Sequence, residues 1–263
     1  MHRSLYKKAS DTDRAYSPGV WADCTVLDYI LRGTGHVLEE RFLLPASVAA
    51  SGAWQGQMPW EIYSSAAGPT LTAVDGGGLT ISSDDDNEQV AFSSLNGAPF
   101  LIAAGEGRLW FEARIKVSTI ANTKFGFFMG LAEAGAAAAN QPLAADGTLA
   151  DINLVGFHHL EADGDMLDTV YKADGQVAQT KQADAITLVA DTYIKPAMYF
   201  DGTILRFFSN GVELSGNVTA AQIAAATFPN DKYLAPCFGI SNAAGGSPGT
   251  ATIERIRVVQ ELL

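Results

Sequence analysis

The sequence predicts an all-β protein of the sandwich or barrel kind, and three observations support this prediction. Segments in which apolar and polar residues alternate recur along the chain, as is typical of half-buried strands. Turn dipeptides separate several of them, namely Asp174-Gly175, Asp201-Gly202 and Asn210-Gly211. The last two dipeptides lie nine residues apart, a spacing that is common in sandwiches and barrels.

The clearest strand runs from Trp110 to Val117, where apolar and charged residues alternate with the period of a half-buried antiparallel strand. Segment 124–131 is almost entirely apolar, which predicts a strand buried on both faces. A short helix is predicted over 219–226, before Pro229. The other predicted strands are 59–63, 79–81, 152–160, 169–172, 186–189, 196–200, 203–209, 234–240 and 252–259.

The composition is that of a folded chain with a large core. Of the 263 residues, 48% are hydrophobic and only 17% are charged, which excludes disorder over most of the chain. The apolar runs are too short to cross a membrane, and none follows the basic start, so we expect neither a membrane segment nor a secretory signal. The net charge of −12 argues against nucleic acid as a partner, because phosphate binding needs a positive field.

The charge is unevenly distributed and suggests two parts. Residues 1–50 carry six basic and six acidic side chains, which cancel, so the excess negative charge lies in the rest of the chain. We predict an extended N-terminal arm over residues 1–54, with a helical turn where Val26, Leu27, Ile30 and Leu31 have helical spacing. Residues 55–263 would form the β domain. The arm is apolar enough to lie on a surface, either that of its own domain or that of a neighbouring subunit.

Read in order, the strands resemble the concanavalin A-like lectin/glucanase jelly roll, in the version found in tailed-phage virion proteins. The resemblance covers about residues 55–263 and implies an antiparallel β-sandwich, to which the arm does not belong. The resembling segments are LWFEARIKVS (109–118), FGFFMGLAE (125–133), INLVGFHHLEADG (152–164), YFDGTILRFFSNGVEL (199–214), LAPCFGISNA (234–243) and TIERIRVVQEL (252–262).

Phage domains of this kind usually serve as capsid decoration or cement proteins. The resemblance therefore implies a non-enzymatic structural protein on the outer surface of the virion capsid, made in the host cytoplasm. Its partner would be the major capsid protein, on which we expect it to form a homo-oligomer. The candidate docking residues of the arm are Arg3, Lys7, Lys8, Arg14, Trp21, Phe42, Leu43 and Leu44.

The resemblance also brings in a hydrolase motif, E-x-D-x-x-E, whose two glutamates act as nucleophile and acid/base. The nearest match begins at Glu161 and ends at Met166, which stands where the second glutamate is needed. Gly164 also predicts a turn at a position where the motif needs a strand. We therefore expect no enzyme and assign no catalytic residue.

Carbohydrate binding is the alternative function, as in a module of a tail fibre or a host-surface reader. It would require exposed aromatic side chains on which a sugar can pack. The candidates are Trp54, Trp60 and Tyr63, which cluster before the first clear strand. Aromatic residues near strands are, however, more often part of a core or an interface. Trp110 shares its strand face with charged residues and is expected to be partly exposed.

Calcium is the only cofactor for which the sequence offers candidates. Asp84, Asp85 and Asp86 begin the densest acidic cluster, and carboxylates are ligands that Ca²⁺ prefers. The cluster lacks the spaced pattern of a calcium loop, so a solvated turn is the other interpretation. Asp163 and Asp165 form a second, smaller candidate.

The histidine and cysteine residues are interpreted structurally. His158 and His159 are adjacent on a predicted strand and must point to opposite faces, so they cannot jointly bind a metal. We expect one of them packed and the other exposed. Cys24 and Cys237 have no metal-ligand spacing, which favours two buried free thiols over a disulfide.

Overall fold

The structure is a computed structural model. It describes residues 16–24, 33–42, 52–55, 59–64, 70–74, 77–82, 89–94, 97–118, 120, 126–133, 141–144, 146–160, 164–242 and 249–262.

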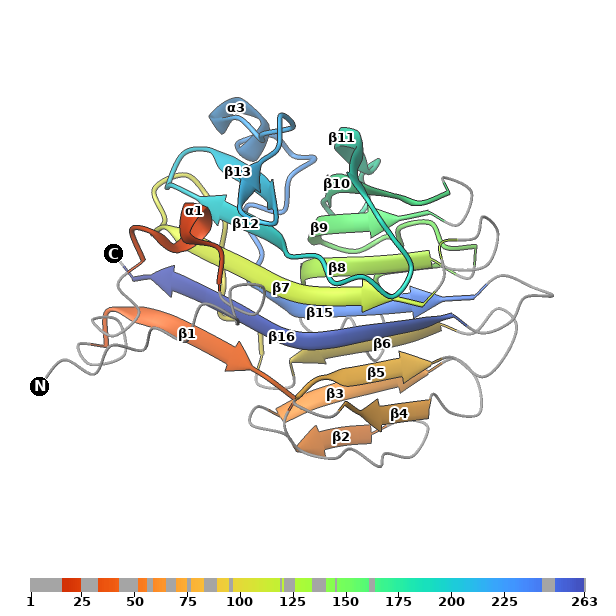
Figure 1. The fold of residues 1–263 in the computed structure, drawn as a ribbon. Coiled ribbons are helices and arrows are strands. Elements are labelled where there is room, and N and C mark those ends of the chain that lie inside the picture. The colour runs from red at the N-terminus through yellow and green to blue at the C-terminus, as the bar shows by residue number, and fades with distance from the viewer. Residues whose placement is uncertain are drawn as a thin grey trace, which may run out of the picture.

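Two antiparallel sheets pack face to face (Figure 1), which confirms the predicted all-β sandwich. Sheet A joins, in this order, β14 (Val212–Glu213), β13 (Leu205–Ser209), β12 (Pro196–Phe200), β7 (Leu109–Val117), β16 (Thr250–Glu261), β5 (Leu79–Ser82) and β4 (Thr70–Ala73), and β1 (Gly35–Glu40) also pairs with β16. Sheet B joins β11 (Gln179–Thr187), β10 (Met166–Lys172), β9 (Leu154–His159), β8 (Gly126–Glu133), β15 (Leu234–Ser241), β6 (Gln89–Ser94), β3 (Pro59–Ser64) and β2 (Gly52–Gln55).

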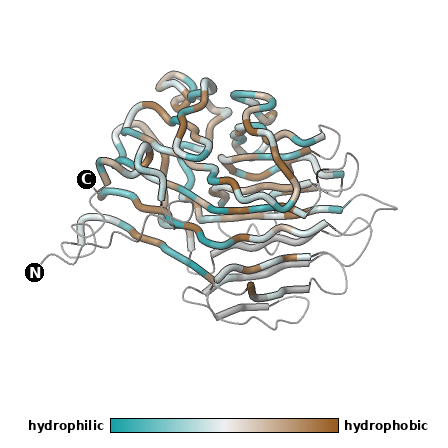
Figure 2. The backbone as a smooth tube through the Cα atoms, in the orientation of Figure 1, coloured by the Kyte–Doolittle hydropathy of each residue, from teal (hydrophilic) through white to brown (hydrophobic). Residues whose placement is uncertain are grey.

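The main core lies between the sheets and follows from the alternation of the strands. In β7, Phe111, Ala113 and Ile115 all point into it and are fully buried. Each large apolar side chain removed from water in this way contributes about 1.5–3 kcal/mol. The apolar segments of both sheets are visible along the backbone in Figure 2.

The other face of β7 is buried as well, so the prediction of a half-buried strand is wrong here. Glu112 is 0% exposed and Arg114 is 4% exposed. Arg114 is covered by Tyr193, with its guanidinium 3.7 Å from the ring centroid. Segment 16–24 covers Glu112, whose Oε2 accepts a hydrogen bond from the backbone N–H of Ser17, and its helix α1 (Pro18–Trp21) lies against β12. Trp110, which was expected to be partly exposed, is fully buried beneath this segment with Val20.

Part of the segment assigned to the arm belongs to the sandwich. β1 pairs with the C-terminal strand, Gly35 lying opposite Glu261, and β2 pairs with β3. Phe42 follows β1 with a φ of 49° and is 1% exposed in the main core. The described N-terminal residues therefore pack back on their own domain. The expected helical turn around Val26 lies outside the described residues.

The predicted turns and the short helix are present. Gly175 and Gly202 have positive φ angles, and both Asn210 and Gly211 do so as well, as a type I′ hairpin turn requires. Helix α3 (Ala220–Ile223) is shorter than predicted and begins with a capping box between Thr219 and Gln222. Among the described helices, none is long and apolar enough to cross a membrane.

Candidate functional site

A pocket of about 370 Å³ opens at one end of the sandwich. The strand register creates the pocket. Leu154 of β9 pairs with Lys172 of β10 on one side and with Ala132 of β8 on the other. Glu133 of β8 pairs in turn with Leu234 of β15. The loops beside these strand ends therefore meet. The lining residues are Asn153, Ala173, Asp174, Ala226, Phe228, Asn230, Asp231 and Lys232.

Asn153 holds one wall of the pocket together. It is 2% exposed; its Oδ1 accepts a hydrogen bond of 3.0 Å from the backbone N–H of Asp174, and its Nδ2 donates to Glu133 Oε2 at 2.6 Å. Because Asp174 is held through its backbone, its carboxylate is not needed for this contact. Behind this wall, Lys172 Nζ lies 3.1 Å from Asp151 Oδ1.

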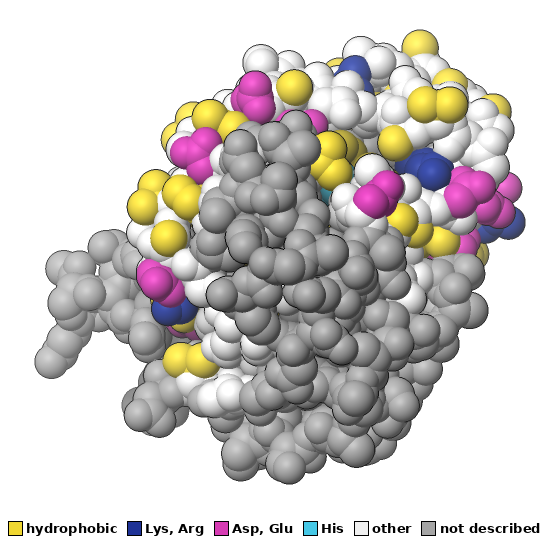
Figure 3. All heavy atoms as spheres, turned by 90° about the vertical axis from the view of Figure 1, so that its right-hand side faces the viewer, with side chains coloured by type: hydrophobic (Ala, Val, Ile, Leu, Met, Phe, Trp, Pro, Cys, Tyr) yellow, Lys and Arg dark blue, Asp and Glu magenta, His cyan; other side chains and the backbone are white. Residues whose placement is uncertain are grey.

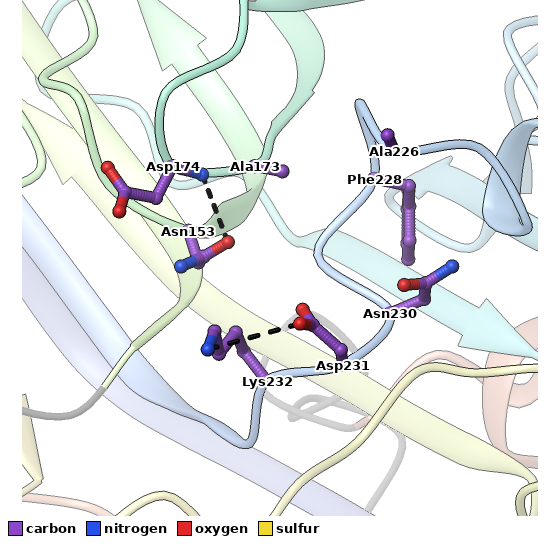
Figure 4. A pocket seen from close by; sticks show the side chains of 8 residues that line it. All are labelled: Asn153, Ala173, Asp174, Ala226, Phe228, Asn230, Asp231 and Lys232. Atoms are coloured by element: carbon purple, nitrogen blue, oxygen red, sulfur yellow. Dashed lines mark hydrogen bonds and ion pairs between the residues drawn. The ribbon is translucent and has the colours of Figure 1, made fainter.

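The opposite wall is the loop between α3 and β15. Phe228 is buried against Tyr171, with 5.0 Å between the ring centroids. Asn230 Nδ2 donates to the carbonyl oxygen of Ile223 at 2.6 Å, which fixes the loop to the helix. Figure 4 shows Asn153 and Asp174 on one side of the pocket and the loop residues on the other.

The groups that remain available to a ligand are mainly charged. Asp174 and Asp231 are exposed, and Lys232 Nζ lies 3.9 Å from Asp231 Oδ2. Two carboxylates and an ammonium group around a partly apolar floor can bind hydroxyl groups and can move protons. Among the described residues, no group of three or more histidine, cysteine and acidic side chains is arranged to hold a metal.

On the face that Figure 3 shows, acidic and basic side chains lie interspersed, and the described part of that face has no basic patch.

Of the interrupted hydrolase motif, the structure describes Gly164, Asp165 and Met166. Gly164 has a φ of 74°, and Met166 begins β10. Glu161 and Asp163 lie outside the described residues. The preceding strand, β9, has the sequence LVGFHH and carries no carboxylate.

The aromatic candidates do not form a described sugar platform. Trp60 is 0% exposed and contacts Phe42 and Phe238, with ring centroids 5.6 and 6.0 Å apart, so the prediction that it binds sugar is wrong. Trp54 and Tyr63 lie in β2 and β3, but their side chains are outside the described part of the structure.

The two docking candidates that the structure describes, Trp21 and Phe42, pack against their own domain. Trp21 packs edge-on against Tyr16 at 5.5 Å and joins the cluster around Trp110, and Phe42 is in the core. Phe42 is therefore not available to a capsid, whereas Trp21 is only partly buried. The other candidates, Arg3, Lys7, Lys8, Arg14, Leu43 and Leu44, lie outside the described residues, as do the calcium candidates Asp84, Asp85 and Asp86.

Both histidines are packed, which corrects the expectation of one exposed ring. His158 is 8% exposed and its Nε2 lies 2.8 Å from the carbonyl oxygen of Gly147. His159 is 0% exposed and its Nδ1 lies 2.8 Å from the carbonyl oxygen of Met166. Cys24 and Cys237 are free thiols; only Cys237 is fully buried, and burial raises its thiol pKa.

The sequence matches no protein-family model and no curated protein. Solved structures match its fold. The endo-1,3-β-glucanase from Streptomyces sioyaensis shares 13% identity at a TM-score of 0.58, over 88% of this chain and 98% of the other. SCLam, a non-specific endo-β-1,3(4)-glucanase from family GH16, shares 11% sequence identity at a TM-score of 0.59. The match covers 87% of this chain and 92% of SCLam. The endo-β-1,3-glucanase from Pyrococcus furiosus shares 11% sequence identity at a TM-score of 0.52. The match covers 86% of this chain and 94% of that enzyme.

The fold is the concanavalin A-like jelly roll. The comparisons contradict the expectation of a non-enzymatic capsid decoration protein, because the similar structures are glucanases, other glycoside hydrolases and a transglycosylase, and nothing in them points to phage virions. The expectation that the protein is not an enzyme rested on Met166 in place of the second glutamate of the hydrolase motif. The same finding contradicts it. Identities of 11–16% establish the fold and leave the activity to be proposed.

Sequence reasoning missed the pocket residues. Asp174 was noticed only as part of a turn dipeptide and Asn153 only as part of the resembling segment 152–164, whereas Asp231 and Lys232 lie in a segment without a motif. No local signal could have grouped them, since 78 residues along the chain separate Asn153 from Asp231. Only the pairing of β8, β9, β10 and β15 brings them together.

Proposed function

We propose that this protein is a carbohydrate-active enzyme, a glycoside hydrolase that binds a β-glucan at the pocket and uses Asp174 and Asp231 as its catalytic carboxylates. The observation that carries the proposal is the position of these two exposed carboxylates on different walls of one pocket. The fold shared with glucanases supports the choice of substrate.

The two carboxylates have different surroundings, which suggests different roles. Asp231 has the ammonium group of Lys232 at 3.9 Å, so we assign to it the role that needs a negative charge, either nucleophile or base. Asp174 then serves as the proton donor. In the overall reaction the glycosidic C–O bond breaks, the leaving oxygen gains a proton, and the hydroxyl group of water ends on the anomeric carbon.

The pocket offers further contacts for recognition. The volume of about 370 Å³ lies near the small end of the range for ligand pockets, so it suits one or two sugar units rather than a long buried chain. The walls are preformed by the hydrogen bonds of Asn153 and Asn230, so little ordering is needed when a ligand binds.

The test is the release of reducing sugar from a soluble β-1,3-glucan by the wild-type protein and by Asp174→Asn and Asp231→Asn. We expect each substitution to lower kcat at least about 100-fold, because general acid–base catalysis contributes that much. Asp191→Asn is the matched control: Asp191 is 72% exposed, lies outside the pocket, and has a φ of 57° that asparagine tolerates.

Two results would overturn the proposal. One is a wild-type protein that binds no β-glucan and releases no sugar from it. The other is robust hydrolysis that both substitutions leave unchanged, which would place the catalytic carboxylates elsewhere in the chain.

A further inference from the structure

The turn that carries Asp174 is complete in its own backbone. Residues 173–176 form this turn, which is closed by a hydrogen bond of 3.0 Å from the backbone N–H of Gln176 to the carbonyl oxygen of Ala173. Gly175 has a φ of 71°, which glycine adopts without strain. No side chain is therefore needed to form the turn.

The two peptide groups that flank Asp174 are nevertheless both held from outside the turn. The backbone N–H of Asp174 donates to Asn153 Oδ1 at 3.0 Å, and that of Gly175 donates to Asp151 Oδ1, also at 3.0 Å. Because each peptide group is planar, fixing both of them fixes the φ and ψ angles of the residue between them. The Cα–Cβ bond of Asp174 then has one direction, and its side chain can move only among staggered rotamers.

Asp151 is itself held by a buried lysine. Lys172, at the end of β10, is 8% exposed, and its Nζ lies 3.1 Å from Asp151 Oδ1 and donates to the carbonyl oxygen of Ala150 at 3.0 Å. The hydrogen bonds from Lys172 and from the backbone N–H of Gly175 lower the pKa of the Asp151 carboxyl. Asp151 is therefore a charged acceptor at neutral pH, and its position is tied to the strand that leads into the turn.

A second Asp-Gly turn of the chain is held differently. After β12, the carboxylate of Asp201 itself accepts hydrogen bonds from the backbone N–H groups of Thr203 and Ile204, at 2.9 and 2.8 Å. The fold thus occupies the oxygens of that carboxylate. Within the described part of the chain, the carboxylate of Asp174 takes part in no hydrogen bond or ion pair. Side chains of the neighbouring loop hold this turn instead, which leaves the carboxylate to a ligand.

Stability does not account for the contacts of Asp151. Its side chain is 63% exposed, and exposed ion pairs contribute little to the free energy of unfolding. A fixed orientation of a reacting group, by contrast, contributes strongly to catalysis. We propose that Asp151 is a positioning residue for the hydrolysis proposed above, and that it acts by fixing the orientation of the Asp174 carboxylate. This inference rests on the proposed function and adds to it a residue that does not line the pocket.

The test compares kcat and KM of the wild-type protein and of Asp151→Ala on a soluble β-1,3-glucan. We expect kcat to fall at least about tenfold, because a small misplacement of a reacting group can cost that much. KM should stay close to the wild-type value, since the pocket itself is unchanged. Urea midpoints show whether the variant is folded. An active wild type and an alanine variant with the same kcat would overturn the inference.

Two further variants separate the hydrogen bond from other effects. Asp151→Asn keeps an oxygen acceptor for the backbone N–H of Gly175 and should recover most of the lost kcat. An asparagine variant as slow as the alanine variant would overturn the inference. Asp146→Ala is the matched control: Asp146 is an exposed carboxylate earlier in the same loop and accepts the backbone N–H of Thr148 at 3.1 Å. This control should have the kcat of the wild type.

A double variant shows whether Asp151 acts through Asp174. In an Asp174→Asn protein, Asp151→Ala should cause no further loss of kcat, because the group that it orients is already disabled. A merely structural role would lower the residual rate of the Asp174→Asn protein as well. A further loss of the size seen in the wild-type background would therefore overturn the inference.

Hydrogen exchange of the Gly175 amide, followed by NMR, tests the contact without any turnover. Asp151→Ala should remove the protection of this amide, and unchanged protection would overturn the inference. The kinetic results also distinguish the two proposals. A wild-type protein that releases no sugar overturns the proposed function and, with it, this inference. An active protein that is insensitive to Asp151→Ala overturns this inference alone.

Discussion

At the residue scale, two glycines show how closely two strands of sheet B approach each other. Gly130 of β8 lies opposite Gly156 of β9. A Cβ atom added to Gly156 would lie 2.3 Å from the carbonyl oxygen of Met129 and 2.8 Å from the Cα of Gly130. These atoms belong to the backbone of a central strand and cannot yield as a flexible side chain can. The pair therefore fixes the spacing of the strands that lead to the pocket.

This geometry gives a stability prediction. Gly156→Ala should lower the free energy of unfolding by about 1–3 kcal/mol, as overpacking in a well-packed interior does. Urea unfolding at equilibrium measures it. Val177→Ala, at a side chain 77% exposed, is the control and should stay within about 0.5 kcal/mol of wild type. A Gly156→Ala protein as stable as the wild type would mean that β8 and β9 can separate at no cost.

At the element scale, the contact between Tyr199 of β12 and Asp23 of segment 16–24 couples the stability of the molecule to alkaline pH. Burial, followed by the hydrogen bond to Asp23 and its charge, raises the pKa of Tyr199 to about 12 from 10.0. At a pH between 10.0 and about 12, Tyr199 has lost its phenolic proton in the unfolded chain but retains it in the folded protein. The unfolded state then binds fewer protons, so stability falls as pH rises.

The predicted result is a loss of stability between pH 10 and about 12, with a smaller loss in Tyr199→Phe than in the wild type. Urea midpoints measured across this range, with tyrosine ionisation followed by absorbance, test it. Cys24, whose pKa burial raises to about 12, adds to the fall in both proteins and cancels in the comparison. An equally steep loss in both proteins would contradict the role given to Tyr199.

The elements also show what the sequence can predict and what it cannot. Strand β7 was predictable because alternation is a local pattern, and the turn at Asn210-Gly211 was predictable because this dipeptide marks it. The burial of Glu112 was not, because its cover lies 95 residues away at Ser17. The pocket was missed for the same reason. Local chemistry predicts strands and turns, whereas sites depend on strand register.

The functional expectation failed for a related reason. It transferred a role from proteins that share strand patterns, although those patterns record the packing of two sheets rather than what the surface binds. The arm, read as a docking device from its charge and apolar patch, contains β1 and Phe42, which complete the sandwich. Apolar content in a terminal segment does not distinguish a surface that binds a partner from one that packs on its own domain.

At the scale of the whole molecule, the last strand is central. β16 lies between β7 and β5 in sheet A and also pairs with β1. A chain that ends before Thr250 should therefore have no folded state, because three strands lose their partner. Far-UV circular dichroism and proteolysis would test this. A chain that ends at Glu261 is the control and should fold, and a compact, protease-resistant product from the shorter chain would contradict the prediction.

The position of β16 also determines when the protein can fold during its synthesis. Ribosomes add about 5–20 residues per second, and the strand on which sheet A depends is made after all the other described strands. Until then, the edges of β1, β5 and β7 stay unpaired and can pair with those of another nascent chain. The long sequence separation of these pairings also makes folding slow. Sheet A thus stays incomplete until the residues of β16 have left the ribosome.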